Sequence, residues 1–170
     1  MFGIEETRGA SSSDVALMLS TPVRFDAGLI ARLLAANDAI NGHLASLLCR
    51  LDDDVEASVG AIKDCADQLH SVRQAEALWL YPVIAHSVEF DVEARAQLVR
   101  LRLAMLALAR RVLRRCDDLI QALRSDGQVA HAAQRMTDAW SEYLRRNQQE
   151  IYPLYELVGR RPAAAAARAA

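Results

Sequence analysis

Four polar side chains interrupt runs of apolar residues with helical spacing, and they are the first candidates for chemistry in this sequence. Asn37 and Asn41 interrupt one run, Glu76 interrupts a second, and Asn147 follows Tyr143 by about one helical turn in a third. A buried carboxylate without a partner is costly, so it shifts its pKa or finds a donor, and a buried amide must also be paired. Either Glu76 and Asn147 lie at a solvated rim, or these residues meet in a polar layer across the core.

His70 lies in the stretch LHSVRQA, residues 69–75, which offers a second kind of chemistry. This stretch resembles the sequence around the phosphoacceptor of histidine phosphotransfer modules, in which an apolar and then a basic residue follow the histidine. Gln74 stands where such modules favour glycine, which admits the partner's active site. The resemblance implies that His70 is a candidate phosphoacceptor. The other histidines fall beside the apolar runs or near helix ends, which predicts surface positions: His43, His86 and His131.

Signatures of catalysis do not stand out in this sequence. It has no Ser/His/Asp or Cys/His order typical of nucleophilic catalysis, no Gly-rich phosphate loop and no HExxH motif. A formal net charge of −2 gives no strong attraction to nucleic acid or to an anionic membrane. The arginine run at 110–115 is typical of a solvated helix face. We therefore expect a protein that is not an enzyme and that binds neither nucleic acid nor a membrane.

The cysteines and the first residues bear on the cellular location. Cys49, Cys65 and Cys116 form no CxxC pair, and an odd, scattered set is not a disulfide framework. Each lies on or beside an apolar run, which predicts small buried thiols in a reducing cytoplasm. The first residues are acidic and polar, unlike a secretory signal, and no apolar run reaches the roughly 18 residues of a membrane span. These features favour a cytoplasmic protein.

Four long helices are predicted to position these side chains. The 170 residues include only seven glycines and four prolines and are 52% hydrophobic, which favours one all-helical domain. Because the connections are short, neighbouring helices should be antiparallel, in an up-down-up-down four-helix bundle. The predicted helices cover residues 22 or 26 to 51, 54 to 86, 91 to 124 and 128 to 158. The predicted domain covers 22–159, with a flexible lead at 1–21 and a disordered alanine-rich tail at 160–170.

Individual residues are expected to end the helices and to fill the core. The aspartates at 52–54 can cap the second helix, Gly127 suits a left-handed C-cap, and Gly159 ends the last helix. Trp79 and Trp140 are expected to pack on the bundle, whereas exposure of either would indicate a dimer or partner face. The predicted core, read at helical spacing, is Ile30, Leu33, Leu34, Ile40, Leu44, Leu47, Leu48, Leu51, Ile62, Cys65, Leu69, Val72, Leu80, Val83, Leu98, Leu101, Met105, Leu108, Val112, Leu119, Leu123, Ala132, Met136, Ala139, Tyr143, Ile151 and Leu154.

Two Tyr-Pro pairs interrupt the second and fourth predicted helices, in LYP at 80–82 and IYP at 151–153. Proline inside a helix costs roughly 3 kcal/mol, so its presence twice in the same setting needs a reason. The stretches EALWLYP and YLRRNQQEIYP resemble the helices of hemerythrin-like (HHE cation-binding) domains, which carry His-x-x-x-Glu before an aromatic-Pro pair. The resemblance covers residues 24–158 and implies a four-helix scaffold built around two irons.

The same resemblance implies that the iron ligands have been lost from the second and fourth helices. Glu76 keeps the carboxylate position of the second helix, but the histidine position falls on Val72. On the fourth helix the carboxylate position falls on Asn147 and the histidine position on Tyr143. One carboxylate is therefore the only ligand that these two helices retain.

The first and third helices contribute no imidazole either. The histidine position of the first helix falls on Asn37, and that of the third helix falls on Met105 or Arg102, between which the sequence does not decide. Iron in such sites prefers mixed nitrogen and oxygen ligands. We therefore expect no metal ligands and no cofactor, iron included.

Three functions remain open at this point. The first is a hemerythrin-like bundle without iron that acts as a binding or regulatory protein, with another protein, a small ligand or a second copy of itself as its partner. The second is an altered metal or oxygen site that uses Glu76, Tyr143 and Asn41. The third is phosphotransfer through His70. Under the first function, the relic polar site comprises Asn37, Glu76, Tyr143 and Asn147.

Overall fold

The computed structural model describes residues 24–51, 54–125 and 127–168, with side chains up to residue 160. Every regular element in these ranges is a helix, so the predicted all-helical fold with four long helices is confirmed. The elements are α2 (Leu29–Leu48), α3 (Val55–Ala75), η1 (Glu76–Leu80), α4 (Tyr81–Ser87), α5 (Val92–Arg124), α6 (Val129–Arg146), η2 (Asn147–Ile151) and α7 (Tyr152–Arg168). The predicted lead at 1–21 lies outside the described residues.

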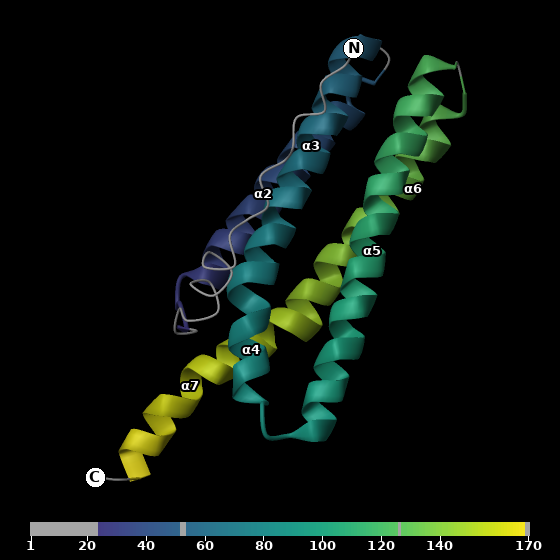
Figure 1. Ribbon diagram of the computed structural model, residues 1–170. Coiled ribbons are helices and arrows are strands. Elements are labelled where there is room, and N and C mark those ends of the chain that lie inside the picture. The colour runs from purple at the N-terminus through teal and green to yellow at the C-terminus, as the bar shows by residue number, and fades with distance from the viewer. Residues whose placement is uncertain (1–23, 52–53, 126, 169–170) are drawn as a thin grey trace, which may run out of the picture.

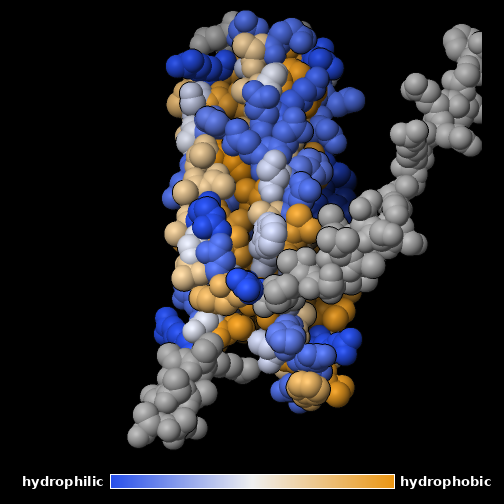
Figure 2. Space-filling view, turned by 60° about the vertical axis from the view of Figure 1, so that its left-hand side comes forward, coloured by the Kyte–Doolittle hydropathy of each residue, from blue (hydrophilic) through white to orange (hydrophobic). Residues whose placement is uncertain are grey.

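The elements form four long rods, because η1 joins α3 to α4 and η2 joins α6 to α7 without a break (Figure 1). Neighbouring rods run in opposite directions, with short connections between them. α2 packs on α3, α3 on α5, α5 on α6, and α4 on α7. The buried side chains form one continuous apolar cluster, and hydrophobic residues show between the hydrophilic ones along the bundle in Figure 2. No helix in the described ranges combines the length and the apolar character that a membrane span requires.

Aspartate caps start the second and third rods. The side chain of Asp54 accepts a hydrogen bond from the Ala57 N–H at 3.0 Å, and that of Asp91 accepts one from the Ala94 N–H at 2.9 Å. Such caps satisfy backbone donors that the first turn of a helix leaves unpaired. The cap predicted at 52–54 is therefore confirmed for Asp54.

The two Tyr-Pro pairs each come directly after a wide turn of π-helix. The Tyr81 N–H donates to the Glu76 carbonyl, and the Tyr152 N–H donates to the Asn147 carbonyl, each five residues back. A π-turn inserts one extra residue and loosens the helix locally. Because proline lacks a donor and crowds the preceding turn, this looser turn gives Pro82 and Pro153 a place in long rods.

The extra residue in η2 changes which side chains face the core. Leu154, which we predicted in the core, is 37% exposed, whereas Tyr155 is 1% exposed. The prediction assumed an uninterrupted α-helical period, and the π-turn advances the buried face by about one residue. The other predicted core residues are buried, except for Leu34, Leu48 and Leu101, which are half-buried.

Gly159 does not end the last helix, because α7 continues to Arg168. The ring of Phe25 lies where a side chain at Gly159 would begin, and it also stacks on Tyr155 with 4.8 Å between ring centroids. Glycine is therefore needed here for close packing. The alanines beyond it are the strongest helix formers, which explains the continuation.

Three further expectations are wrong. Gly127 does not adopt a left-handed conformation, and its N–H donates to the Ala122 carbonyl at 3.0 Å. Cys49 is exposed because it lies just after the last turn of α2, whereas Cys65 and Cys116 are buried as expected. Trp79 lies on the outer side of η1 and is 60% exposed, beside Leu78, which is 53% exposed. Trp140 is buried as expected.

The first rod is also shorter than predicted. α2 begins at Leu29 and ends at Leu48. Before it, the chain forms a turn. The carboxylate of Asp26 accepts a hydrogen bond from the Gly28 N–H at 2.8 Å and pairs with the guanidinium of Arg32. Residues 49–51 leave the helix toward the next connection.

Candidate functional site

A polar layer crosses the middle of the bundle. Asn37 from α2, Glu76 from η1, Tyr143 from α6 and Asn147 from η2 are all buried, with Glu76 3% exposed. The alternative that Glu76 and Asn147 lie at a solvated rim is therefore wrong. The rods bring residues from three distant parts of the sequence to one level, which is where bundles usually build their sites.

Hydrogen bonds tie this layer together around Glu76. The Tyr143 hydroxyl donates to one carboxylate oxygen at 3.0 Å, and the Tyr152 hydroxyl donates to the other at 3.5 Å. The Asn37 amide in turn donates to the Tyr152 hydroxyl at 3.1 Å. Tyr152 is a member of this network that the sequence reasoning missed, because the Tyr-Pro pair was interpreted only as part of the scaffold.

Some polar atoms of the layer remain unpaired. The Asn147 amide lies close to Glu76 and Tyr143 but makes no hydrogen bond of good geometry, and the Asn37 carbonyl oxygen also has no partner. The buried hydroxyl of Tyr81 is likewise unpaired. Buried polar atoms are nearly always hydrogen-bonded, so such a group of exceptions marks a site that needs an explanation.

Burial sets the protonation of the layer. It raises the pKa of Glu76 to about 7, although the Tyr143 hydroxyl and the nearby Arg73 guanidinium act to lower it. Burial raises the pKa of Tyr143 well above its ordinary value, and the adjacent charge of Glu76 raises it further. The same two causes raise the pKa of Tyr152. The phenols are therefore neutral donors, and the carboxyl changes its charge near neutral pH.

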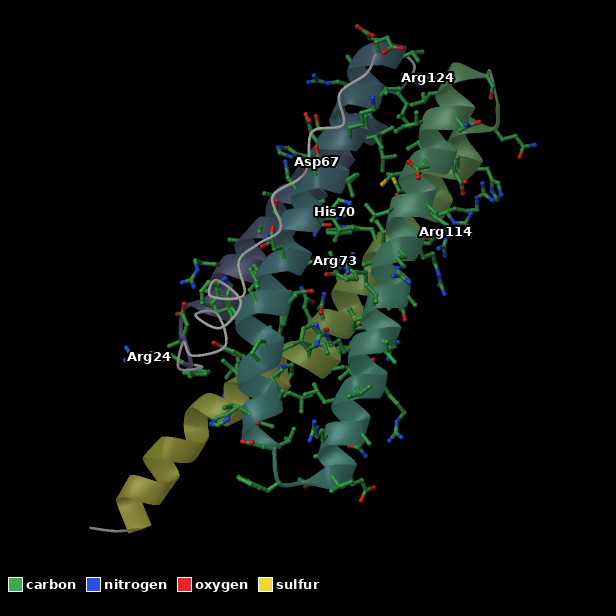
Figure 3. The ribbon with its side chains drawn as sticks, viewed as in Figure 1. Arg24, Asp67, His70, Arg73, Arg114 and Arg124 are labelled. Atoms are coloured by element: carbon green, nitrogen blue, oxygen red, sulfur yellow. The ribbon has the colours of Figure 1, made fainter. Side chains whose placement is uncertain are left out.

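A cleft of about 390 Å³ leads from the surface to this layer. It lies between α3, η1 and α4 on one side and α5 on the other, and Glu76 and Tyr143 are among its lining residues. Arg73 from α3 lines it beside α5 (Figure 3), and Arg102 lines it from α5. The polar layer is therefore accessible from one side of the bundle.

The third helix places Met105 inward and Arg102 outward. Met105 is buried and lines the cleft, whereas the exposed Arg102 holds its guanidinium carbon 5.4 Å from the centre of the Tyr81 ring. Of the two candidates for the ligand position on this helix, Met105 therefore occupies the position that faces the core. Neither side chain is an imidazole.

These residues do not fit a di-iron centre. At the positions that the resemblance assigns to ligands, one carboxylate is accompanied by two amides, a phenol with a raised pKa, and two apolar side chains. Such a set offers no imidazole nitrogen and no second carboxylate to bridge two ions. In the described ranges, no three His, Cys, Asp or Glu side chains lie close enough together to hold a metal ion.

Asn41 does not join Glu76 and Tyr143, contrary to the altered-site hypothesis. Its side-chain oxygen accepts a hydrogen bond from the Trp140 indole at 2.6 Å, and the residue is exposed. His70 lies exposed on α3, one turn before Arg73, and so occupies the surface rather than the polar layer. The other histidines are also exposed, as predicted: His43, His86 and His131.

Comparison with known proteins gives no relative for this chain: no family model, no curated protein and no solved structure matches it. The site must therefore be interpreted from its own geometry.

Proposed function

We propose that this protein is a non-enzymatic, hemerythrin-like bundle that has lost its di-iron site and acts as a ligand-binding regulatory protein. One observation carries the proposal: a cleft of about 390 Å³ reaches a buried carboxylate held by two tyrosine hydroxyls at 3.0 and 3.5 Å. In the proposed ancestry, this polar layer occupies the level at which the irons were bound.

The matched π-turns support the hemerythrin-like scaffold. Glu76 and Asn147 each begin a π-turn that ends directly before a Tyr-Pro pair. The second and fourth rods therefore carry the same π-turn and Tyr-Pro pair at equivalent positions. This is expected if both rods once supplied metal ligands from the same position.

The hydrogen-bond network supports loss of the metal. Tyr143 stands at the position that the resemblance assigns to a histidine ligand, and its hydroxyl donates a hydrogen bond to Glu76. The carboxylate that a metal ion would need as a ligand is therefore already paired with a side-chain donor. Reversing this arrangement would require a phenol with a raised pKa to give up its proton. The layer is thus suited to neutral hydrogen bonding and a bound organic molecule rather than to a metal ion.

Metal content tests the first half of the proposal. Protein purified from iron-replete cells should contain far less than one metal ion per chain and should show no visible absorption band. Glu76→Gln should have the same metal content as the wild-type protein. Near-stoichiometric iron in the wild-type protein that disappears in Glu76→Gln would overturn the proposal and establish the altered metal site instead.

Phosphotransfer through His70 is a second candidate function, because the imidazole is exposed on a helical bundle as such a role requires. Incubation with a phosphorylated response regulator should label the wild-type protein but not His70→Gln, with His131→Gln as a surface control. Equal labelling of the wild-type protein and His70→Gln, or none of either, would remove this candidate.

The exposed pair Leu78 and Trp79 supports a protein partner, for which we propose a second copy of the chain. Sedimentation should then show a concentration-dependent dimer that Trp79→Ser weakens. A wild-type protein that remains monomeric at high concentration would exclude it. We also propose a cytoplasmic location, where the buried thiols Cys65 and Cys116 stay reduced.

A further inference from the structure

Two arginines line the cleft, and neither is held in an ion pair within the described part of the chain. Arg73 from α3 and Arg102 from α5 lie on its opposite sides. Neither forms an ion pair with a described carboxylate, whereas Arg115 and Arg146 on the surface of α5 and α6 do. Glu76 is the carboxylate in the cleft lining, so the lining carries an excess of positive charge.

Tyr81 adds an unpaired hydrogen-bond donor directly behind the wall of the same cleft. Its side chain lines the cleft and is 6% exposed, yet its hydroxyl has no partner. The guanidinium carbon of Arg102 lies 5.4 Å from the centre of the Tyr81 ring, so a cation and this tyrosine share one part of the lining. A buried, unpaired hydroxyl destabilises the protein unless a ligand supplies the missing acceptor.

The rest of the lining is apolar. Val99, Leu103 and Leu106 form the α5 side of the cleft, and Val99 and Leu103 remain more than half exposed at its opening. Such a surface favours a ligand with a hydrocarbon body. A volume of about 390 Å³ is in the range of small-molecule sites.

We propose that this cleft binds a small organic anion with an apolar body, of the class of aliphatic or aromatic carboxylates. The carboxylate accepts hydrogen bonds from Arg73, Arg102 and the Tyr81 hydroxyl, and the body lies along Val99 and Leu103. Guanidinium groups suit this task because their N–H groups match a carboxylate in pairs. This inference rests on the proposed ligand-binding function and names the ligand class of that site.

The carboxylate of Glu76 does not oppose this arrangement strongly. Its two oxygens accept the hydroxyls of Tyr143 and Tyr152, so they are directed into the polar layer. The two guanidinium groups outnumber it in the lining. The incoming anion therefore meets donors before it approaches Glu76.

Calorimetric titration of the full-length protein with octanoate, octan-1-ol and octylamine tests the ligand class. We expect octanoate to bind at least about tenfold more tightly than the alcohol or the amine, a ratio equivalent to about 1.4 kcal/mol. Arg73→Gln and Arg102→Gln should each weaken octanoate binding about tenfold. Arg100→Gln, an exposed arginine on α5 outside the cleft lining, is the matched control and should leave the affinity unchanged.

Tyr81→Phe separates binding from folding. Removal of an unpaired buried hydroxyl should leave the thermal stability of the free protein equal or higher, while octanoate binding falls severalfold. This variant therefore remains informative even if an arginine variant folds poorly.

Four results would overturn the inference: no octanoate binding, equal or tighter binding of octan-1-ol or octylamine, an equal loss in Arg100→Gln, and full affinity in Tyr81→Phe. Tight binding of the alcohol would refute the anionic class and leave the proposed ligand-binding function intact. Near-stoichiometric iron in the same preparation would refute the proposed function itself, so the two failures are distinguishable.

Discussion

Glu76→Gln should make the protein more stable at pH 8, because it removes a carboxylate that folding forces to hold its proton. Burial raises the pKa of this group from an ordinary value of 4.5 to about 7 in the folded protein. Glutamine has nearly the shape of the protonated acid and keeps an oxygen that can accept from Tyr143. The substitution therefore preserves the packing and one hydrogen bond while it removes the titration.

The magnitude comes from the linkage between proton binding and folding. Between pH 4.5 and about 7 the folded state holds a proton on Glu76 that the unfolded state has released, so this group's contribution to stability is full at low pH and is lost as the pH rises. One pKa unit corresponds to about 1.36 kcal/mol, so the total loss is about 3 kcal/mol. For a chain of this size that loss corresponds to a melting temperature lower by about 6–12 °C.

The assay is urea denaturation of the wild-type protein and Glu76→Gln at a series of pH values from 4 to 8. The free energies of unfolding should be similar at pH 4, and Glu76→Gln should become more stable by about 3 kcal/mol by pH 8. All other titrating groups are shared, so they cancel in the difference between the two proteins. Glu150→Gln is the control with the opposite sign, because Arg146 holds the pKa of Glu150 below its usual range. Parallel pH profiles for the wild-type protein and Glu76→Gln would refute the reasoning, since they would mean that the pKa of Glu76 is the same in the folded and unfolded states.

Two further substitutions test the packing around the site. Tyr143→Phe removes the 3.0 Å hydrogen bond to Glu76, so the free energy of unfolding measured in urea should fall by about 1–3 kcal/mol, and an unchanged value would show that the bond contributes nothing. Gly159→Ala should destabilise the protein by about 1–3 kcal/mol, because its methyl group would meet the ring of Phe25. Gly42→Ala in α2 is the matched control: nothing lies within 4 Å of its added methyl group, so it should stabilise by up to about 1 kcal/mol. A higher melting temperature for both glycine variants would contradict the close packing at Gly159.

The amphipathic period was sufficient to predict the rods and most of their buried faces. Ile40, Leu69 and Met136, for example, lie in the core because a helix with apolar residues at that spacing has only one face to bury. The same pattern identified Glu76 and Asn147 as polar residues inside those faces. It left open whether they were solvated, since that depends on how the neighbouring rods close over them.

The amphipathic period could not predict which residues are buried beyond the second π-turn. An uninterrupted helix places Leu154 in the core, and the extra residue of η2 brings Tyr152 and Tyr155 there instead. The pattern along one helix could not predict the cleft either, because Arg73 and Arg102 line the same cleft only where α3 and α5 face each other. The Tyr-Pro pairs were the available signal for the first of these effects, and sequence alone gives no comparable signal for the second.

The two π-turns explain why one chain carries an interior Tyr-Pro pair twice, and the two tyrosines differ in a way that bears on the proposed ligand site. Each turn begins with a polar residue and brings the tyrosine before the proline into the core. Tyr152 donates from there to Glu76 and so completes the buried network. Tyr81, its counterpart on the second rod, lines the cleft and keeps a buried, unpaired hydroxyl. The two turns are equivalent in geometry, yet only one of the two hydroxyls has an acceptor among the described residues. Under the proposed ligand binding, the bound anion supplies the acceptor that Tyr81 lacks, which is why Tyr81→Phe is the decisive variant.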